Sequence, residues 1–378
     1  MSTKDAPILV ELVTCANAPG KQIAEITLNS PATLNSLTLA MIDAITPLLE
    51  AWRHDDSVVC VVLRGAQERA FCAGGDVQAL QQTILRNQAA GSIVDTYADD
   101  FFEREYRLDY LIHTYAKPIV VLGHGIVMGG GLGLFGGASV RVVSEKSRIA
   151  LPEITIGLFP DAGASWLLRK LPSGHAAFLG YTGANINARD ALDCGWATHA
   201  VASEGIYQVT QHLGTLAWSK DPQEHLPQAQ QLLKQNDAGI DALLPDAQLR
   251  ACEADLDPSS AASAADAMAT LELQAGGSPW IDKALATMRR GCPTSLGIVG
   301  EQLRRILTMN LVECFQMEMI VAAQCARHAD FAEGVRALLV DKDNAPQWQY
   351  TDMASLPDGH VAAHFAPPWE TNPLHDLA

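Results

Sequence analysis

The sequence predicts an α/β fold with a helical C-terminal region. Strand patterns alternate with helical patterns over residues 1–205, which is typical of a sheet layered against helices. The stretch 206–290 is rich in Ala, Gln, Leu and Asp, and a strong helical periodicity returns within 291–378. With 48% apolar and 18% charged residues, the 378-residue chain can bury a sizeable core. We therefore expect an α/β core, a divergent helical region, and a C-terminal helical region with a tail.

The expected core strands differ in their patterns. AEITLNS (24–30) alternates apolar and polar residues, as a half-buried strand does. VVCVVLRG (58–65) and PIVVLGHG (118–125) are continuous apolar runs, which are typical of strands buried on both faces. VRVVSEKSRIAL (140–151) follows a glycine-rich turn and a short predicted helix. Together these strands, which alternate with helices, predict a layered α/β domain.

Helical patterns lie between and after these strands. Thr38 can cap a helix whose apolar residues recur at helical spacing, at Ile42, Ile45, Leu49 and Trp52. A second helical pattern covers 79–117. DLDPSSAASAADA (255–267) is expected to be an exposed helix start or a linker. The proline-containing end, 365–378, is expected to lie draped on the surface or to be disordered.

Composition and cysteine spacing exclude several classes of protein. The net charge of −17 speaks against a surface for nucleic acid or anionic membranes, since these need a basic footprint. A membrane-spanning helix needs a run of about 18 apolar residues, and the sequence contains no such run. The eight cysteines form no C-x-x-C pair, which indicates buried thiols rather than disulfides or a zinc site. The start, MSTKDAPILVELV, resembles neither a secretion signal nor a transit peptide, so a cytoplasmic protein is expected.

Glycine-rich turns are the first candidates for a functional site. FCAGGD (71–76) follows a predicted strand, and GHGIVMGGGLGLFGG (123–137) follows another. Such turns let the backbone approach a ligand closely and aim N–H groups at it. Two N–H groups from separate turns, converging on one carbonyl oxygen, would form an oxyanion hole. Tight packing or simple turns are the alternative for either cluster alone.

One motif in the second cluster suggests a different function. GLGLFG (131–136) fits G-x-G-x-x-G, the fingerprint of dinucleotide-binding dehydrogenases. In such proteins the strand runs straight into the first glycine. Here GHGIVMGG (123–130) separates the predicted strand from the motif, which counts against a dinucleotide site.

A third stretch holds two carboxylates in mostly apolar surroundings. ALPEITIGLFPDAG (150–163) contains Glu153 and Asp161, separated by Gly157 and Pro160. Because the glycine and the proline interrupt a helical path, the loop can fold both acids into one pocket. Like charges that share a pocket raise the pKa of one of them.

Four motifs occur in an order that resembles the crotonase superfamily. They are FCAGGD, HGIVMGGGLGL, PEITIGLFPDAG and the late DFAEGVRALLVDKD (330–343). Within the superfamily they are most similar to the 3-hydroxyisobutyryl-CoA hydrolases. The resemblance implies a spiral of ββα units with two roughly perpendicular sheets and a C-terminal helical region over the active site. It also implies an acyl-CoA substrate, with CoA as part of that substrate and no cofactor, and it leaves a homo-oligomer open.

The resemblance also assigns roles to single residues. At the matching positions, the N–H groups of Gly75 and Gly130 form the oxyanion hole. Glu105, within FFEREY, matches a glutamate in the substrate pocket of the hydrolases. Gly133 stands where hydratases of the superfamily have one of their two catalytic glutamates, and glycine cannot transfer a proton.

Two carboxylates are left for catalysis. Glu153 is the glutamate of the PE motif. Asp161 stands where hydratases usually have glycine and where the hydrolases have aspartate. The resemblance therefore implies hydrolysis of a short branched 3-hydroxyacyl-CoA, above all 3-hydroxyisobutyryl-CoA in valine breakdown. Glu153 would attack the thioester carbonyl or deprotonate a water. Asp161 would orient the substrate or the water, or share the proton.

Each candidate also has a purely structural interpretation. Asp161 could cap the helix expected at AGASWLLRKL (162–171), and Glu153 could be a solvated loop residue. Glu105 could lie on a solvated helix face. Near the glycine turns we expect a histidine bonded to backbone, a packed thiol and a helix cap, at His124, Cys72 and Asp76 respectively.

Two other functions stay open on the sequence. An enoyl-CoA isomerase or hydratase of the same fold is one, because dienoyl-CoA isomerases also have an aspartate near the position of Asp161. A non-catalytic acyl-CoA-binding protein is the other. Release of free thiol from an acyl-CoA would separate hydrolysis from both.

Overall fold

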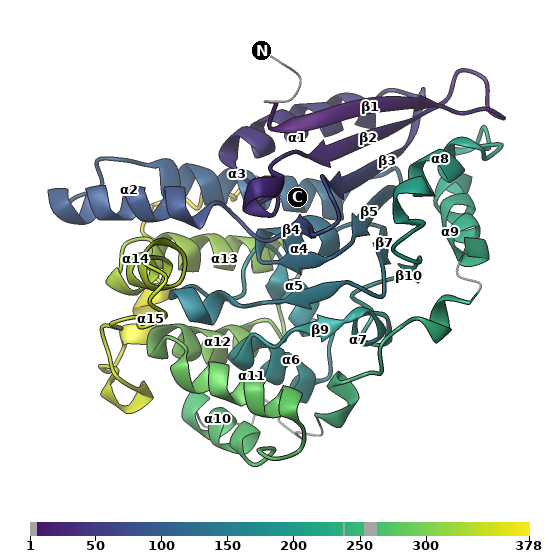
Figure 1. Ribbon diagram of the computed structural model, residues 1–378. Helices are drawn as coiled ribbons and strands as arrows, with labels where there is room; N and C mark the ends of the chain where they lie inside the picture. The colour runs from purple at the N-terminus through teal and green to yellow at the C-terminus, as the bar shows by residue number, and fades with distance from the viewer. Residues whose placement is uncertain (1–5, 237–238, 253–262) are drawn as a thin grey trace. The chain divides into compact units, whose positions relative to one another are not determined.

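The computed structural model describes residues 6–236, 239–252 and 263–378 (Figure 1). The chain forms two compact units, and each combines segments that are distant in the sequence. Unit 1 consists of Met1–Gly75, Leu108–Ile149 and Ile186–Ala247. Unit 2 consists of Asp76–Arg107, Ala150–Asn185 and Gln248–Ala378. The division at residues 205 and 290 stays a prediction from composition.

Unit 1 is built on a six-stranded sheet with the strand order β1-β2-β3-β5-β7-β10. β1 is antiparallel to β2, and the other neighbouring strands are parallel. The two continuous apolar runs form buried strands, as predicted. The strand bounds are β1 (Ile8–Thr14), β2 (Gln22–Leu28), β3 (Val58–Gly65), β5 (Ile119–Gly123), β7 (Val140–Val143) and β10 (His199–Ala200).

A second, four-stranded sheet has the order β4-β6-β8-β9. Its bounds are β4 (Ala70–Cys72), β6 (Ile126–Met128), β8 (Arg148–Ala150) and β9 (Ile186–Asn187). The helices of unit 1 are α1 (Leu39–Arg53), α4 (Gly130–Gly136), α7 (Ala188–Asp193), α8 (Val209–Gly214) and α9 (His225–Asn236). The hydroxyl of Thr38 caps α1 by accepting a hydrogen bond from the N–H of Met41, as predicted.

Strand β2 is buried on both faces, although its alternating pattern predicted burial on one. The polar residues explain the error, because they have partners inside the protein. Glu25 forms an ion pair with Arg64 at 2.8 Å and accepts a hydrogen bond from the hydroxyl of Thr210. Arg64 also donates to the hydroxyl of Thr27 at 3.1 Å. An alternating pattern here indicates a paired polar face rather than a solvated one.

Two helices of the divergent region cover the six-stranded sheet. Leu213 of α8 and Leu233 of α9 belong to one buried cluster with Val62 of β3 and Leu122 of β5. The strands of a parallel sheet carry apolar side chains on both faces, so helices must cover both faces. This part of the divergent region therefore completes the core of unit 1.

Unit 2 is mostly helical, as the resemblance implied for the C-terminal region (Figure 1). The helix predicted over 79–117 is two helices, because Gly91, with φ of 65°, ends the first of them. The boundary between the units at residues 107 and 108 falls within the second. The helices are α2 (Val77–Ala90), α3 (Tyr97–His113), α5 (Ala164–Arg169), α6 (Ser173–Thr182), α10 (Ala264–Glu272), α11 (Pro279–Arg290), α12 (Pro293–Arg305), α13 (Leu311–Cys325), α14 (Ala329–Val335) and α15 (His360–His364).

The end of the chain lies on the surface of unit 2, and the disordered alternative is wrong. Phe365 and Leu374 are buried and anchor it. Arg107 donates to the carbonyl of Pro373 at 2.7 Å and pairs with Asp376 at 2.8 Å. Most of the expected linker, 253–262, lies outside the described residues. The helix start after it is confirmed, because the hydroxyl of Ser263 caps α10.

Candidate active site

Glu153 lies in a tight turn of unit 2 that follows β8. Pro152 precedes a 3-10 turn over Glu153–Ile156, and Gly157 ends the turn with φ of 72°. The Glu153 side chain is buried, so the solvated-loop interpretation is wrong. Neither of its carboxyl oxygens has a hydrogen-bond partner among the described residues. A buried carboxyl group without a partner is costly and is typical of functional sites.

The pKa of Glu153 is raised well above its ordinary value. Burial is the main cause, because it penalises the charged form, and the negative charge of Asp161 is the second. The charges of Glu105 and Glu318 add to the effect. The expectation that nearness to Asp161 raises one of the two pKa values is confirmed.

Asp161 is buried and accepts a hydrogen bond from the hydroxyl of Tyr106 at 2.5 Å. Burial raises the pKa of Asp161 to about 6, and the Tyr106 bond opposes this rise. The helix-cap interpretation is wrong, because Gly163 is the cap residue of α5 and the Asp161 carboxylate makes no cap bond. Asp161 is therefore the more readily ionised partner of the pair at neutral pH.

Glu105 lies on α3, next to Tyr106 in the sequence, and it is buried. The solvated-face interpretation is thus wrong. Burial raises its pKa well above the ordinary value, with further contributions from the charges of Asp161 and Glu318. One of its carboxyl oxygens, Oε1, lacks a partner among the described residues. We call Glu105, Glu153, Asp161 and Glu318 the acidic cluster; all four belong to unit 2.

Sequence reasoning missed two members of this site, Glu318 and Tyr106. Glu318 is fully buried on α13, in the apolar segment FQMEMIVAA. A carboxylate in a mostly apolar segment is a detectable signal, because charged residues are almost never fully buried without a partner. Tyr106 gave no such signal, since a tyrosine in a helix is most simply a core residue.

The two predicted glycine turns lie together in unit 1. Strands β4 and β6 are parallel neighbours, and both turns leave them at the same end. A Cβ on Gly131 would lie 2.3 Å from the carbonyl oxygen of Cys72, and one on Gly74 would lie 3.5 Å from that of Met128. Because Gly131 has no side chain, the two backbones can approach this closely.

The N–H groups of Gly75 and Gly130 are free to bind a ligand. Neither donates a hydrogen bond to the part of the chain that the structure describes. Gly130 is the first residue of α4, where helix N–H groups have no partner within the helix. The donors lie in unit 1 and the acidic cluster lies in unit 2.

The other predictions near the glycine turns are confirmed. The ring nitrogens of His124 contact the carbonyls of Leu122 and Gln67 at 2.9 and 2.8 Å, so it is a structural histidine. The Cys72 thiol is buried. Asp76 caps α2 by accepting from the N–H of Ala79. The glycines of GLGLFG lie inside α4 rather than in a turn, which agrees with the argument against a dinucleotide site.

Comparisons with known proteins identify the family. The model of the enoyl-CoA hydratase/isomerase family matches residues 23–365. The chain belongs to this family, within the crotonase superfamily. It is 37% identical to the mitochondrial 3-hydroxyisobutyryl-CoA hydrolase of Gallus gallus, over 90% of this chain and 86% of the relative. It is 38% identical to that of Danio rerio, with the same coverage. A solved structure, a carnitinyl-CoA dehydratase from Mycobacterium thermoresistibile, is 30% identical with a TM-score of 0.80 and covers 98% of this chain and 99% of its own.

The late motif of this family member lies against the turn that carries Glu153. A Cβ on Gly334 of α14 would lie 2.4 Å from the carbonyl carbon of Ile156, and one on Gly157 would lie 2.4 Å from the carbonyl oxygen of Asp330. Glycine at both positions is needed for this approach, which is far below ordinary contact distance. The backbone of α14 therefore forms one wall of the Glu153 turn.

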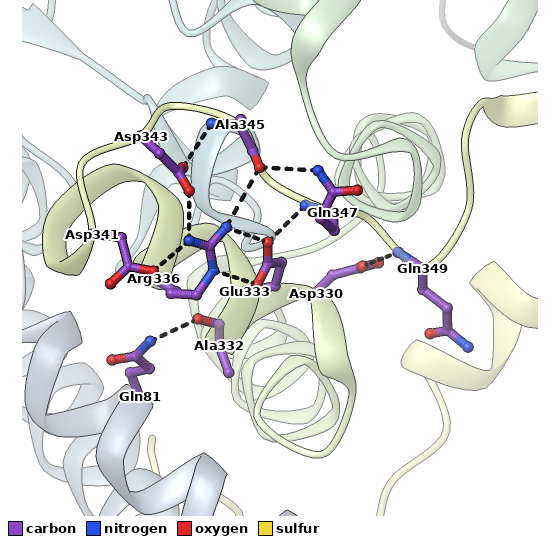
Figure 2. Close-up of polar contacts among 10 residues, drawn as sticks. All are labelled: Gln81, Asp330, Ala332, Glu333, Arg336, Asp341, Asp343, Ala345, Gln347 and Gln349. Atoms are coloured by element: carbon purple, nitrogen blue, oxygen red, sulfur yellow. Dashed lines mark hydrogen bonds and ion pairs between the residues drawn. The ribbon is translucent and has the colours of Figure 1, made fainter.

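A polar network holds α14 in place (Figure 2). Arg336 donates to both carboxyl oxygens of Glu333, each at 2.8 Å, and to Asp341 at 2.6 Å and Asp343 at 2.7 Å. From α2, the amide of Gln81 donates to a carbonyl of α14 at 3.0 Å. Single exposed ion pairs contribute little to the stability of the fold, whereas one arginine shared by several carboxylates orders all of them at once. The network ties the chain beyond α14 back onto the helix.

Two classes of feature are absent from the described residues. Within 6–236, 239–252 and 263–378, no three His, Cys, Asp or Glu side chains are placed so that they could hold a metal ion. None of the helices in these ranges combines the length and the hydrophobicity that crossing a bilayer requires.

We expect Glu105→Gln to stabilise the protein increasingly as the pH rises. The raised pKa means that the folded state holds the Glu105 proton more tightly than the unfolded state does. The stability from this group is complete below the unfolded pKa of about 4.3 and is lost as the pH rises toward the folded value. Because Gln cannot ionise, the Tm of the variant minus that of the wild type should grow as the pH rises above about 5.

The matched control for this prediction is Glu11→Gln. Glu11 is exposed on β1, so its difference in Tm from the wild type should stay nearly constant over the same range. A Glu105→Gln difference that stays as constant as the control would contradict the prediction. Thermal unfolding followed by circular dichroism measures both.

Proposed function

We propose that this chain hydrolyses 3-hydroxyisobutyryl-CoA to 3-hydroxyisobutyrate and CoA, a step of valine breakdown. The curated relatives reported above are named as hydrolases of this substrate. Glycine at position 133, together with carboxylates at Glu153 and Asp161, carries the proposal. Hydration of a double bond uses two acid–base groups, and Gly133 stands in place of one of them. Hydrolysis needs only one activated nucleophile and one proton donor, which two carboxylates can supply.

The proposal gives the N–H groups of Gly75 and Gly130 the role of oxyanion hole. They would polarise the thioester carbonyl and stabilise the negative oxygen of the tetrahedral intermediate. Support comes from their lack of acceptors in the described chain and from the meeting of the two glycine turns. Each such donor is worth about 10²- to 10³-fold in rate.

The carboxylates would share one proton. In the free protein that proton resides on Glu153, because burial disfavours its charge, and Asp161 is ionised with help from Tyr106. Transfer of the proton to Asp161 frees Glu153 to attack the carbonyl or to deprotonate a water. When the C–S bond breaks, Asp161 gives its proton to the departing sulfur. In the water route Glu153 has meanwhile taken a proton from water, so the starting state is restored. In the nucleophilic route the acyl group stays on Glu153 as a mixed anhydride until a water attacks its acyl carbon. Asp161 takes the proton of that water, the anhydride C–O bond breaks to release the acid, and the proton returns to Glu153.

Glu105 would bind the substrate at the same pocket. It is buried in the acidic cluster and its Oε1 has no partner among the described residues, so it can accept a hydrogen bond from the 3-hydroxyl group. The reaction needs no metal or redox cofactor, and CoA enters as part of the substrate. Only this substrate, and no nucleic acid or membrane, is proposed as a partner; a homo-oligomer stays open.

We also propose a reducing compartment, because all eight cysteines are free thiols. The cytoplasm is the expected location, although the relatives' names place those proteins in mitochondria. Fractionation of cells that produce the protein, with markers for each compartment, decides this. Recovery of the protein with the mitochondrial marker would contradict a cytoplasmic location.

Thiol release tests the proposed function. Purified protein is incubated with 3-hydroxyisobutyryl-, 3-hydroxypropionyl-, crotonyl- and acetyl-CoA, and free CoA is followed with a thiol reagent. We expect the fastest release from the first substrate. An enoyl-CoA isomerase or hydratase would change the acyl chain without freeing thiol. An acyl-CoA-binding protein would bind these esters without turnover, and either outcome would overturn the proposal.

A further inference from the structure

Two buried polar side chains of the C-terminal helices hold the backbone on either side of Asp161. Gln302 lies on α12 and Glu318 on α13, and both are fully buried. The sequence patterns singled out neither residue, and the proposed chemistry uses neither. A fully buried polar side chain is costly unless it makes specific hydrogen bonds, so its partners indicate what it does.

Gln302 bonds to the residue before Asp161. Its amide nitrogen donates to the carbonyl oxygen of Pro160 at 2.6 Å and to the hydroxyl of Ser165 at 2.8 Å. A single side chain therefore bridges the two ends of the loop 160–165. The Pro160 carbonyl would lose a buried hydrogen bond if the amide were removed.

Glu318 bonds to the residues after Asp161. One carboxyl oxygen accepts from the N–H of Gly163 at 2.7 Å, and the other accepts from the N–H of Ser165 at 2.9 Å. These N–H groups stand at the start of α5, whose cap residue, Gly163, has no side chain to bond them. A carboxyl group from another helix thus supplies the cap that α5 lacks.

The loop between these contacts contains a strained residue. Ala162 has φ of 56°, in the left-handed region. For a residue with a Cβ this conformation costs roughly 1–2 kcal/mol, and it persists only where the surroundings enforce it. Asp161 immediately precedes it, and the Asp161 carboxylate is bonded to the Tyr106 hydroxyl in this conformation. Relaxation of Ala162 would move the Asp161 side chain.

We propose that Gln302 and Glu318 are positioning residues, which hold Asp161 where it exchanges its proton. The inference rests on the proposed role of Asp161. Both oxygens of Glu318 are bonded to backbone N–H groups, so it supports the loop rather than reacting. In this way α12 and α13 affect the reaction only indirectly, because they fix the conformation of the loop 160–165 that contains Asp161.

The first test is Glu318→Gln. Glutamine has nearly the same size, but it offers one acceptor oxygen where two N–H groups need one each. We expect kcat for thiol release to fall about 10- to 100-fold, because displacements of about 1 Å cost up to about 10²-fold. KM should change less than about 3-fold, since the contacts that bind substrate are kept.

Gln302→Met is the second variant, and it keeps the inference testable if Glu318→Gln does not fold. Methionine has a similar length and removes the donor to Pro160. The same pattern is expected, a lower kcat with a nearly unchanged KM. A loss confined to KM in both variants would overturn the proposal.

A double variant separates positioning from general damage. In an Asp161→Asn background, the further change Glu318→Gln should lower kcat by less than about 2-fold, because the residue it positions is already gone. If the two losses instead multiply, Glu318 does not act through Asp161.

Asn310→Ala is the matched control. Asn310 caps the same helix that carries Glu318, by accepting from the N–H of Glu313 at 2.9 Å, and among the described residues it makes no hydrogen bond to the loop 160–165. It should lower Tm and leave kcat unchanged. An equal loss of kcat in this control would show that destabilised α13, rather than a misplaced Asp161, slows the reaction.

Crystal structures of the wild type and of Glu318→Gln provide a readout that does not depend on activity. The bond between Tyr106 and Asp161 should be broken or lengthened only in the variant. If it stays unchanged, the positioning role is wrong whatever the kinetics. If the wild type releases no thiol from any acyl-CoA, the proposed function fails, and a displaced Asp161 still supports the structural part.

Discussion

Replacing Glu153 by Gln is expected to abolish nearly all thiol release, with a loss of about 10³-fold or more. The proposed reaction needs Glu153 as nucleophile or general base, and an amide can serve as neither. The fold should survive, because Gln is nearly the same size and the buried carboxyl oxygens have no hydrogen-bond partners to lose among the described residues. The Tm of the variant should therefore equal or exceed that of the wild type, above all at alkaline pH, where the raised pKa makes the wild type less stable.

Steady-state kinetics and thermal unfolding measure the two halves of this prediction. Glu11→Gln on β1 is the matched control, because it makes the same chemical change at an exposed position and should leave kcat and Tm unchanged. A Glu153→Gln protein that is folded and retains full thioesterase activity would remove Glu153 from the mechanism. A protein that loses activity only because it unfolds would show a Tm well below that of the wild type.

Much of the fold could be predicted from the sequence, because strand and helix periodicity follow directly from which faces are buried. The buried runs that became β3 and β5 are continuous apolar segments, and no competing pattern confused them. The prediction for β2 was wrong because alternation shows only that every second residue is polar. It does not show whether Glu25 faces water or a partner such as Arg64, which lies far along the chain.

The sequence pointed to three acids of the candidate site but not to the groups that support them, and the catalytic roles of these acids stay a prediction. Glu153, Asp161 and Glu105 were found from motifs. Their burial and coupling depend on groups distant in the sequence, such as the Tyr106 hydroxyl on Asp161. Likewise, the sequence offers Asp161 as one candidate for the cap of α5, because caps are usually local. Here the cap comes from Glu318 on α13, and no local pattern contains that information.

Gly334→Ala is the substitution outside the reactive residues with the largest expected effect. Helix propensity alone would favour the change, since Ala is better than Gly inside a helix by about 1 kcal/mol. The new Cβ, however, would lie 2.4–2.6 Å from the backbone of Ile156, and backbone cannot swing aside as a flexible side chain can. Reaching ordinary contact requires α14 and the Glu153 turn to separate by about 1 Å. The overpacking costs about 1–3 kcal/mol, which outweighs the gain in propensity.

Such a displacement acts on Glu153 at the other end of a turn of only four residues, Glu153–Ile156. We expect kcat to fall about 10²-fold and Tm to fall as well, since misplacing a reacting group by about 1 Å is enough for this loss. Gly205→Ala is the control, because its φ is −99° and its nearest neighbours lie at 3.5 and 3.6 Å, where a methyl group fits. A Gly334→Ala protein that is more stable than the wild type and equally active would mean that α14 does not fix the Glu153 turn.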